Sequence, residues 1–323
     1  MRWYKITCGS STWDANGDPN ALNVEMDLLK YPQHSPKAGS FVRIWGLDLT
    51  TTLNAAKIYT GKQITVYGGM QKGLPLANPN KQGEQLVSGT VWPAFGTWVD
   101  NNMFVDFIIP SRKTGAGDVP NAANVIHNWP KNTPLAQAMK NTFAQAFPFL
   151  TPIINISSSL IRNYTETGFY QTLGQYASFI FQHSIEIMNN PTYSGVHIWV
   201  HGDNIIASDF TQQSAAKTVD PWDLVGQPAW MSPVLAQVKM VMRGDIQPGD
   251  YITLPPTLAT LGSTAALPNS QASNIMQGSF YVQWIRHTGN FRQPDWPSWC
   301  STYTLIQPGS KALQDYLSSG EIS

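Results

Sequence analysis

Residues 279–287, Ser-Phe-Tyr-Val-Gln-Trp-Ile-Arg-His, decide the fold class of this chain. The run is crowded with β-branched and aromatic side chains, which fit the half-buried, pleated surface of a β-sheet. Similar runs follow at residues 301–306 and precede it at residues 234–242 and 251–254. The two preceding runs are separated by residues 247–250, Gln-Pro-Gly-Asp, which have the Pro and Gly positions of a type II turn. The C-terminal part of the chain is therefore predicted to consist of strands joined by turns.

The N-terminal part carries the same signals. Its β-branched or aromatic runs cover residues 41–45, 63–67, 86–92 and 103–109, with Gly-, Asn- and Pro-rich breaks between them. Several short strands separated by such turns are typical of a barrel or a sandwich. A short helix is expected only at residues 55–59.

The middle of the chain has a different hydrophobic period. A helix is predicted with Thr133 as its N-cap and Pro134 at its first position, and it should end at Pro148. Its apolar residues recur every four positions: Leu135, Met139, Phe143 and Phe147. A second helix is predicted from Gly168 to Asn189. Strands are expected again at residues 196–200 and 205–206.

These signals predict an α+β chain that is mainly β, with two β-barrels flanking a mixed α/β domain. A chain of 323 residues exceeds the usual size of a single hydrophobic core, so several domains are expected. The predicted division is residues 1–112, 113–219 and 220–308, with a C-terminal tail at 309–323. Residues 113–124 are interpreted as a linker and residues 255–278 as a long loop with no charged side chain.

The composition limits the function classes. Charged residues make up 12% of the chain, about half of the usual share, whereas aromatic residues reach 11%. A folded chain so poor in charge is expected to bury much of its surface against other subunits. Basic and acidic residues balance at 20 each without a basic stripe, which argues against nucleic-acid binding.

Neither a signal peptide nor a membrane anchor is expected, because the N-terminus resembles a strand and no apolar run reaches a membrane-spanning length. We therefore expect the protein to be made in the cytosol. Cys8 and Cys300 are the two cysteines of the chain. They exclude a disulfide framework and a cysteine-based zinc motif, and two reduced thiols are favoured over a bridge.

One stretch places oxygen ligands at calcium-loop spacing: Asp14, Asn16, Asp18, Asn20 and Glu25. An EF-hand needs Gly at the sixth position for its sharp turn, and Pro occupies that position here. A turn stabilised by Asx side chains is therefore the favoured interpretation over a calcium site.

A second candidate metal site pairs His197 with His201 on one face of a strand, with Asp203 or Asp209 as a candidate third ligand. No spacing fixes a third ligand. A strand that enters a turn is the favoured interpretation, and the sequence assigns no metal, cofactor or catalytic residue.

Enzymatic activity is not expected. Asp220 and Asp223 are one carboxylate pair among many that could be proposed for glycoside hydrolysis, and the spacing selects none of them. The nucleophile elbow, the Walker loop and the zinc-protease helix motif are all absent from the sequence.

Several segments together resemble the hub proteins of contractile bacteriophage tail baseplates. The N-terminal segments that carry this resemblance are residues 22–26, 42–47, 61–70 and 86–91, and residues 132–139 resemble the helix that opens the family's middle domain. The C-terminal segments are residues 223–228, 238–242, 246–254 and 278–289. In the last of these, Tyr281-Val282 followed by His287-x-Gly289 is the most specific piece.

The resemblance implies a structural protein of the virion. Each barrel would be like a tail-tube subunit, so a homotrimer would present six barrels in a pseudo-sixfold ring. This ring would adapt the sixfold tail tube to the threefold central spike within the tail baseplate, after assembly in the cytoplasm of the bacterial host. The implied partners are the tail tube protein and the central spike protein, with the tape-measure protein and other baseplate subunits as further candidates. Lytic or spike domains would come from those partners, and no cofactor is implied.

Two alternatives remain open at this point. One is another tail component with a tube-like barrel, such as a distal tail or tube-terminating protein. The other is a glycan-binding or glycan-hydrolysing β-protein that uses exposed Trp side chains.

Overall fold

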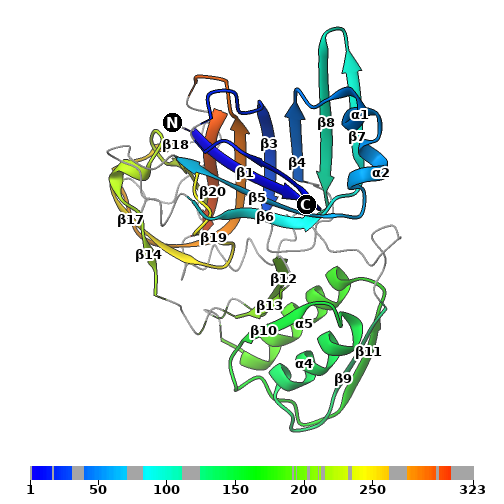
Figure 1. The fold of residues 1–323 in the computed structure, drawn as a ribbon. Helices are drawn as coiled ribbons and strands as arrows, with labels where there is room; N and C mark the ends of the chain where they lie inside the picture. Colours follow the sequence, from blue (N-terminus) through cyan, green and yellow to red (C-terminus); the bar gives the residue numbers. More distant parts are fainter. Residues whose placement is uncertain are drawn as a thin grey trace.

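Figure 1 shows a large β-rich body and, below it, a smaller body of helices and short strands. The computed structural model describes residues 2–16, 18–30, 40–70, 83–110, 124–190, 193, 195–201, 204–209, 211, 215–231, 235–261, 275–295 and 298–306. The expectation of an α+β chain that is mainly β is confirmed.

The N-terminal half of the large body consists of two antiparallel sheets packed face to face. One sheet has the strand order β2 (Ser11–Asp14), β1 (Arg2–Cys8), β5 (Gln63–Met70), β6 (Gln85–Thr90). The other has the order β3 (Val24–Lys30), β4 (Ser40–Trp45), β8 (Asn102–Ile109), β7 (Ala94–Val99). Their inward-facing side chains, such as Ile6, Ile44 and Phe107, form one core. Two short helices, α1 (Leu49–Leu53) and α2 (Ala55–Tyr59), lie beside β7.

The C-terminal half of the large body is built around three long strands: β16 (Leu235–Val241), β20 (Trp299–Ile306) and β19 (Ile275–Asn290). The strand β17 (Tyr251–Leu258) pairs with the first part of β19. Shorter elements complete this half: β14 (Lys217–Thr218), the 3-10 helix η1 (Pro221–Asp223), β15 (Ala229–Trp230) and β18 (Thr260–Leu261). It has a core of its own, which includes Val238, Ile285 and Tyr303.

The two halves join edge to edge through β3 and β19. Residues 285–290 of β19 pair with β3, whereas residues 275–281 pair with β17 on the same side of the strand. The result is one eleven-stranded sheet within the described residues, with the main order β18-β15-β16-β20-β19-β3-β4-β8-β7. Strands from both ends of the chain therefore lie side by side (Figure 1).

The smaller body has a separate core around Trp129, Phe143 and Tyr176. Its helices are α4 (Leu135–Ala146) and α5 (Leu173–Met188). Its strands are β9 (Val125–Trp129), β10 (Thr151–Asn155), β11 (Glu166–Tyr170), β12 (His197–His201) and β13 (Asn204–Ser208). They form a two-stranded sheet, β11-β9, and a three-stranded sheet, β10-β13-β12.

Most predicted strands are confirmed with small shifts of their ends, but both middle helices differ from the prediction. The first helix is capped by Pro134 rather than Thr133. The second begins at Leu173 rather than Gly168, because residues 166–170 pair with β9 as a strand. Pairing with a distant strand has overridden the local helical period.

The C-terminal predictions are confirmed at one turn and corrected at one loop. Gln247 to Asp250 form the predicted turn, closed by a hydrogen bond from Asp250 N to Gln247 O, and Gly249 has the positive φ of 96° that a type II turn needs. The predicted loop at residues 255–278 is partly wrong, since β17, β18 and β19 extend into it at both ends. The rest of that loop lies outside the described residues. Almost all of the predicted linker also lies outside the described residues, as do the predicted domain boundaries at residues 112 and 308. The division into domains therefore stays a prediction.

Candidate functional site

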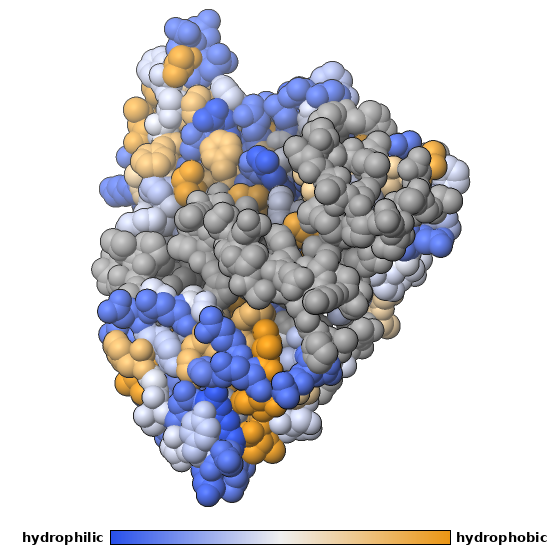
Figure 2. All heavy atoms as spheres, turned by 180° about the vertical axis from the view of Figure 1, so that it is seen from behind, coloured by the Kyte–Doolittle hydropathy of each residue, from blue (hydrophilic) through white to orange (hydrophobic). Residues whose placement is uncertain are grey.

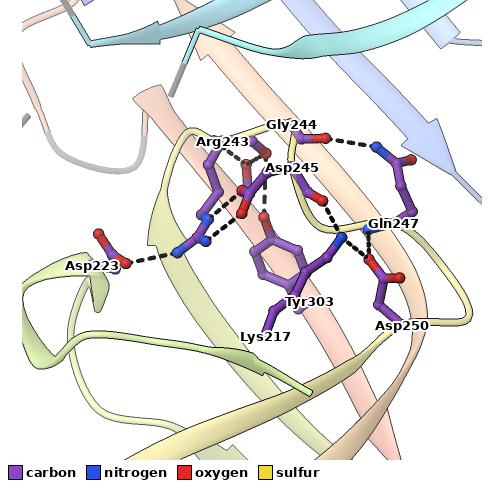
Figure 3. A network of polar contacts seen from close by, with 9 residues as sticks. Lys217, Asp223, Arg243, Gly244, Asp245, Gln247, Asp250 and Tyr303 are labelled. Carbon is purple, nitrogen blue, oxygen red and sulfur yellow. Dashed lines mark hydrogen bonds and ion pairs between the residues drawn. The ribbon is translucent and has the colours of Figure 1, made fainter. Parts of the chain in front are cut away.

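The most concentrated group of polar contacts surrounds Arg243, directly after β16 in the C-terminal half (Figure 3). Its side chain is fully buried. The guanidinium donates two hydrogen bonds to the carboxylate of Asp245, both of 2.6 Å, and a third of 2.6 Å from Nη1 to Asp223 Oδ2. A buried guanidinium without partners would be strongly destabilising, so the two carboxylates explain how it is retained here.

The backbone of Arg243 is also held. Its N–H donates to Ser301 Oγ at 3.2 Å, and its carbonyl accepts from Tyr303 Oη at 3.3 Å. Burial raises the pKa of the Tyr303 phenol above its ordinary value, so this hydroxyl stays protonated as a donor. The segment after β16 is thereby attached to β20.

A second set of contacts continues from this segment to the N-terminal half. Lys217 Nζ lies 2.6 Å from Asp250 Oδ2, which also accepts from Gln247 N at 2.7 Å. Gln247 Nε2 donates to the carbonyl of Gly244 at 2.6 Å. Lys30 Nζ, at the end of β3, donates to Gln247 Oε1 at 2.9 Å. We call the junction between the two halves of the large body the seam. The contacts of Arg243, Asp245, Asp250 and these partners are the seam network.

Lys30, which reaches from the N-terminal half to the C-terminal half, has an unusually low pKa. Burial lowers the pKa of Lys30 to about 7, against an opposing effect of the Asp250 carboxylate, and Lys217 lowers it further. His287 on β19 is fully buried as well, with Nδ1 2.7 Å from Ser301 Oγ. Burial first, and then the charge of Lys30, hold the pKa of His287 well below its ordinary value. Burial thus shifts the ionisation of both groups toward their neutral forms.

Packing ties the same segment to the N-terminal sheets. Met242 belongs to the N-terminal core, and a Cβ added to Gly244 would lie only 2.7 Å from the carbonyl oxygen of Gln85 on β6. From the other direction, Trp299 Nε1 donates to the carbonyl of Gly69 at 2.8 Å. On the outer face, Arg286 forms a bidentate pair with Asp27 at 2.8 and 2.6 Å.

The seam network is therefore suited to fastening two sheets rather than to catalysis. Its carboxylates each face a cation or a backbone N–H of the same network. A shallow hollow of about 400 Å³ lies over the β3–β19 pairing and includes Glu25, Asp27 and Asp295 in its wall. In the part of the chain that the structure describes, no three His, Cys, Asp or Glu side chains gather as metal ligands would.

The structure places the calcium-loop candidates in turns. Asp14 Oδ1 accepts from Asn16 N at 3.0 Å, and Asp18 Oδ1 accepts from Asn20 N at 2.8 Å, as Asx turns do. Glu25 lies on β3, where its Oε1 accepts from the Asn290 amide. The two acids of the turns and Glu25 are not brought together as a ligand group.

The structure describes two of the residues named for the histidine site, His197 and Asp209. His197 is buried on β12 with its ring 5.2 Å from that of Phe181. Asp209 accepts from Ser157 N, Tyr193 Oη and Thr211. The side chain of His201 and residue Asp203 lie outside the described part of the chain.

The remaining candidate residues are the carboxylate pair Asp220 and Asp223 and the two cysteines. Asp220 is exposed before η1, whereas Asp223 is buried in the seam network, so the two do not form an open carboxylate pair. Cys8 and Cys300 are both buried and neither forms a disulfide. Burial raises the pKa of the Cys8 thiol to about 12.

Exposed apolar side chains gather at the end of the long sheet. We call Leu49, Leu53, Phe95, Trp98 and Val99 the β7 surface; they lie on α1 and on both faces of β7, and each is exposed. The β7–β8 hairpin projects from the large body in Figure 1. A smaller exposed pair, Ile126 and Phe169, lies on the outer face of the two-stranded sheet in the smaller body. Figure 2 shows apolar side chains on the surfaces of both bodies.

Comparison with known proteins identifies the fold. No protein-family model and no curated protein matches the sequence. A 43 kDa tail protein of prophage MuSo2 from Shewanella oneidensis aligns with a TM-score of 0.54 at 8% identity, over 96% of this chain and 99% of that one. The chain has the fold of a bacteriophage tail protein. At this identity, the similarity extends to the fold alone.

Two further solved structures align with this chain at lower TM-scores. A tail protein from Neisseria meningitidis gives a TM-score of 0.48 at 9% identity, over 95% of this chain and 97% of that one. A component of the type VI secretion system from E. coli gives 0.45 at 10% identity, over 90% of this chain and 74% of that one.

Sequence reasoning missed the seam network of this tail-protein fold. Arg243 and Asp245 lie close together just after β16 in a chain with few charges, and these two opposite charges were the available signal. Asp223, which binds Arg243, and Lys30, which joins the network through Gln247, are 20 and 213 positions from Arg243, so no local pattern connects them. Among the described residues, no helix is both long and apolar enough to cross a bilayer.

Proposed function

We propose that this chain is a non-catalytic structural subunit of a bacteriophage tail, a baseplate hub that forms a homotrimeric, pseudo-sixfold ring. In this role the ring joins the sixfold tail tube to the threefold central spike in the virion baseplate. The tube and spike proteins are its direct partners, and the tape-measure protein and other baseplate subunits are further candidates. The proposal includes two tube-like β-barrels per chain, one in each half of the large body.

The edge-to-edge pairing of β3 with β19 is the observation that carries this proposal. It makes one continuous sheet from two β-rich halves, each of which has its own core. A subunit with two such halves supplies two ring positions, so three copies supply six. The tail-protein fold and the low content of charged residues support the same role, because ring subunits bury much of their surface.

The polar contacts favour structure over chemistry. The buried charges at the seam are matched by partners from neighbouring strands, which fixes how the two halves are held together. A glycan-active protein instead needs an open pair of carboxylates, and Asp220 and Asp223 do not provide one.

Electron microscopy of purified virions tests the role, with an antibody against the chain to locate it. We expect label at the distal end of the tail and a threefold ring of three copies between tube and spike. A sixfold ring of six copies would favour the alternative tube-like component. A chain that is absent from the virion, or a stable monomer that binds sugars, would overturn the proposal.

A further inference from the structure

We propose that the β7 surface of one copy docks against the β15–β18 edge of a second copy, so that a closed ring leaves neither end of the long sheet open. The inference rests on the proposed function, since it names the contact through which the trimer would form. It assigns two different surfaces of the same chain to one repeated interface.

The β7 end of the sheet lacks the usual protection of a strand edge. Natural edge strands are protected by charged side chains, proline or bulges, because their unpaired backbone groups otherwise recruit another chain. β7, Ala-Phe-Gly-Thr-Trp-Val, contains no charge and no proline. Phe95 is 53% exposed and Trp98 is 61% exposed. Such aromatic side chains are enriched among the residues that dominate binding energy.

The helix α1 covers only part of this strand. A Cβ added to Gly96 would lie 1.7 Å from the carbonyl oxygen of Thr52, so the backbone of α1 lies directly against β7 there. Leu53, the last residue of α1, is nevertheless 72% exposed. The helix therefore adds exposed apolar surface on the face of β7 that carries Gly96 and Trp98, whereas Phe95 and Val99 lie on the opposite face of the strand.

The opposite end of the sheet offers a second open edge. β18 pairs with β15, and no described strand pairs with its other side. Exposed apolar residues flank this edge: Met231 follows β15 and is 50% exposed, and Leu258 ends β17 and is 59% exposed. The other short edge strand, β14, carries Lys217, whose charge is held by Asp250. We therefore select β15–β18 over β14.

A second copy is the occupant that fits both ends. Within one chain, an edge of the N-terminal half already pairs with a strand of the C-terminal half, at β3 and β19. The two ends of the long sheet are again one from each half, and they lie on opposite sides of the large body (Figure 1). Pairing β7 with another β7 would leave the β18 edge open. A head-to-tail contact satisfies both edges and gives a ring when its rotation closes.

Two charge-introducing variants and one control test the interface. Trp98→Glu changes the β7 surface and Leu258→Glu changes the opposite edge. Phe169→Glu is the matched control, because Phe169 in the smaller body is 61% exposed, the same fraction as Trp98. Mass photometry measures the assembly state, and circular dichroism checks that each variant is folded. We expect trimers for the unmodified chain and for Phe169→Glu, and loss of the trimer for both edge variants.

Mixing the two edge variants gives the sharpest result. Each keeps one intact surface, so Trp98→Glu and Leu258→Glu together should form a heterodimer that neither forms alone. Trimers that survive both substitutions, or variants that do not complement each other, would overturn the docking surface while the trimeric hub stands. An unmodified chain that stays monomeric, together with virions that lack a threefold ring of the chain, would overturn both.

Discussion

The N-terminal half of the large body has two strand edges with opposite character. At the β3 edge, β19 completes the ladder, and Lys30 and Asp27 reach partners in the C-terminal half. At the β7 edge, no described strand completes the ladder, and Phe95 and Trp98 are exposed. The first edge is used within the chain and combines polar with apolar contacts. The second has the character of a contact that the chain cannot satisfy by itself.

The difference indicates what each edge contributes. Substitutions at the seam should act on folding, because the partners there are buried and belong to the same chain. Substitutions at the β7 edge should act on assembly and leave folding nearly unchanged. Four experiments test this division.

The largest effect on folding is expected for Arg243→Met. It leaves the Asp223 and Asp245 carboxylates without their shared buried cation, and breaking a buried pair typically lowers the free energy of unfolding by about 3–5 kcal/mol. Urea unfolding measures the change. Lys239→Met, at an exposed position of the neighbouring β16, is the control. Equal stabilities of the two variants would show that the network does not hold the seam.

The next effect is a pH dependence caused by Lys30. Its pKa is about 7 in the folded protein and 10.5 in the unfolded chain. Between these pH values the unfolded chain binds one more proton than the folded protein, so the free energy of unfolding rises with pH. Relative to Lys30→Met, the free energy of unfolding of the native protein should gain on the order of 4 kcal/mol between about pH 7 and pH 10 and nothing below that range. Unfolding of both proteins across this range measures the difference. A constant difference would mean that Lys30 is not neutralised by burial.

A smaller effect is expected for Gly244→Ala. The added methyl group must displace the backbone of Gln85, because their separation would be 2.7 Å, and such overpacking costs about 1–3 kcal/mol. Gly226→Ala is a useful comparison, because nothing lies near its added methyl group and only its positive φ of 80° opposes the change. The thermal unfolding temperatures of both variants separate the effect of steric contact at residue 244 from the effect of backbone strain at residue 226. An unchanged Gly244→Ala protein would place the segment away from β6.

The smallest effect on folding is expected for Trp98→Glu, at the β7 edge. Exposed substitutions usually change the free energy of unfolding by less than about 0.5 kcal/mol. Urea unfolding at a concentration where the unmodified chain is monomeric measures this value. A loss as large as that of Arg243→Met would show that Trp98 belongs to the fold, and the contrast between the two edges would fail.

Local patterns predicted much of this fold because strands and turns leave local signals. The runs at residues 63–67 and 279–287 are strands, and the Pro248-Gly249 turn has the expected geometry. The error at residues 168–170 has a physical cause. That segment fits a helical period, yet β9 supplies a ladder for it as a strand.

The sequence by itself determined the kind of protein this is: a mainly β chain with few charges, two β-rich ends and a helical middle. Only the tertiary structure decided how the ends meet. The pairing of β3 with β19 joins residues more than 250 positions apart, and Arg243 finds its carboxylates only after η1 and β16 have packed. Side-chain period along a strand specifies which face is buried, but it carries no information about which strand lies at either edge. That choice depends on contacts between distant segments, and at β7 we infer that it depends on another copy of the chain.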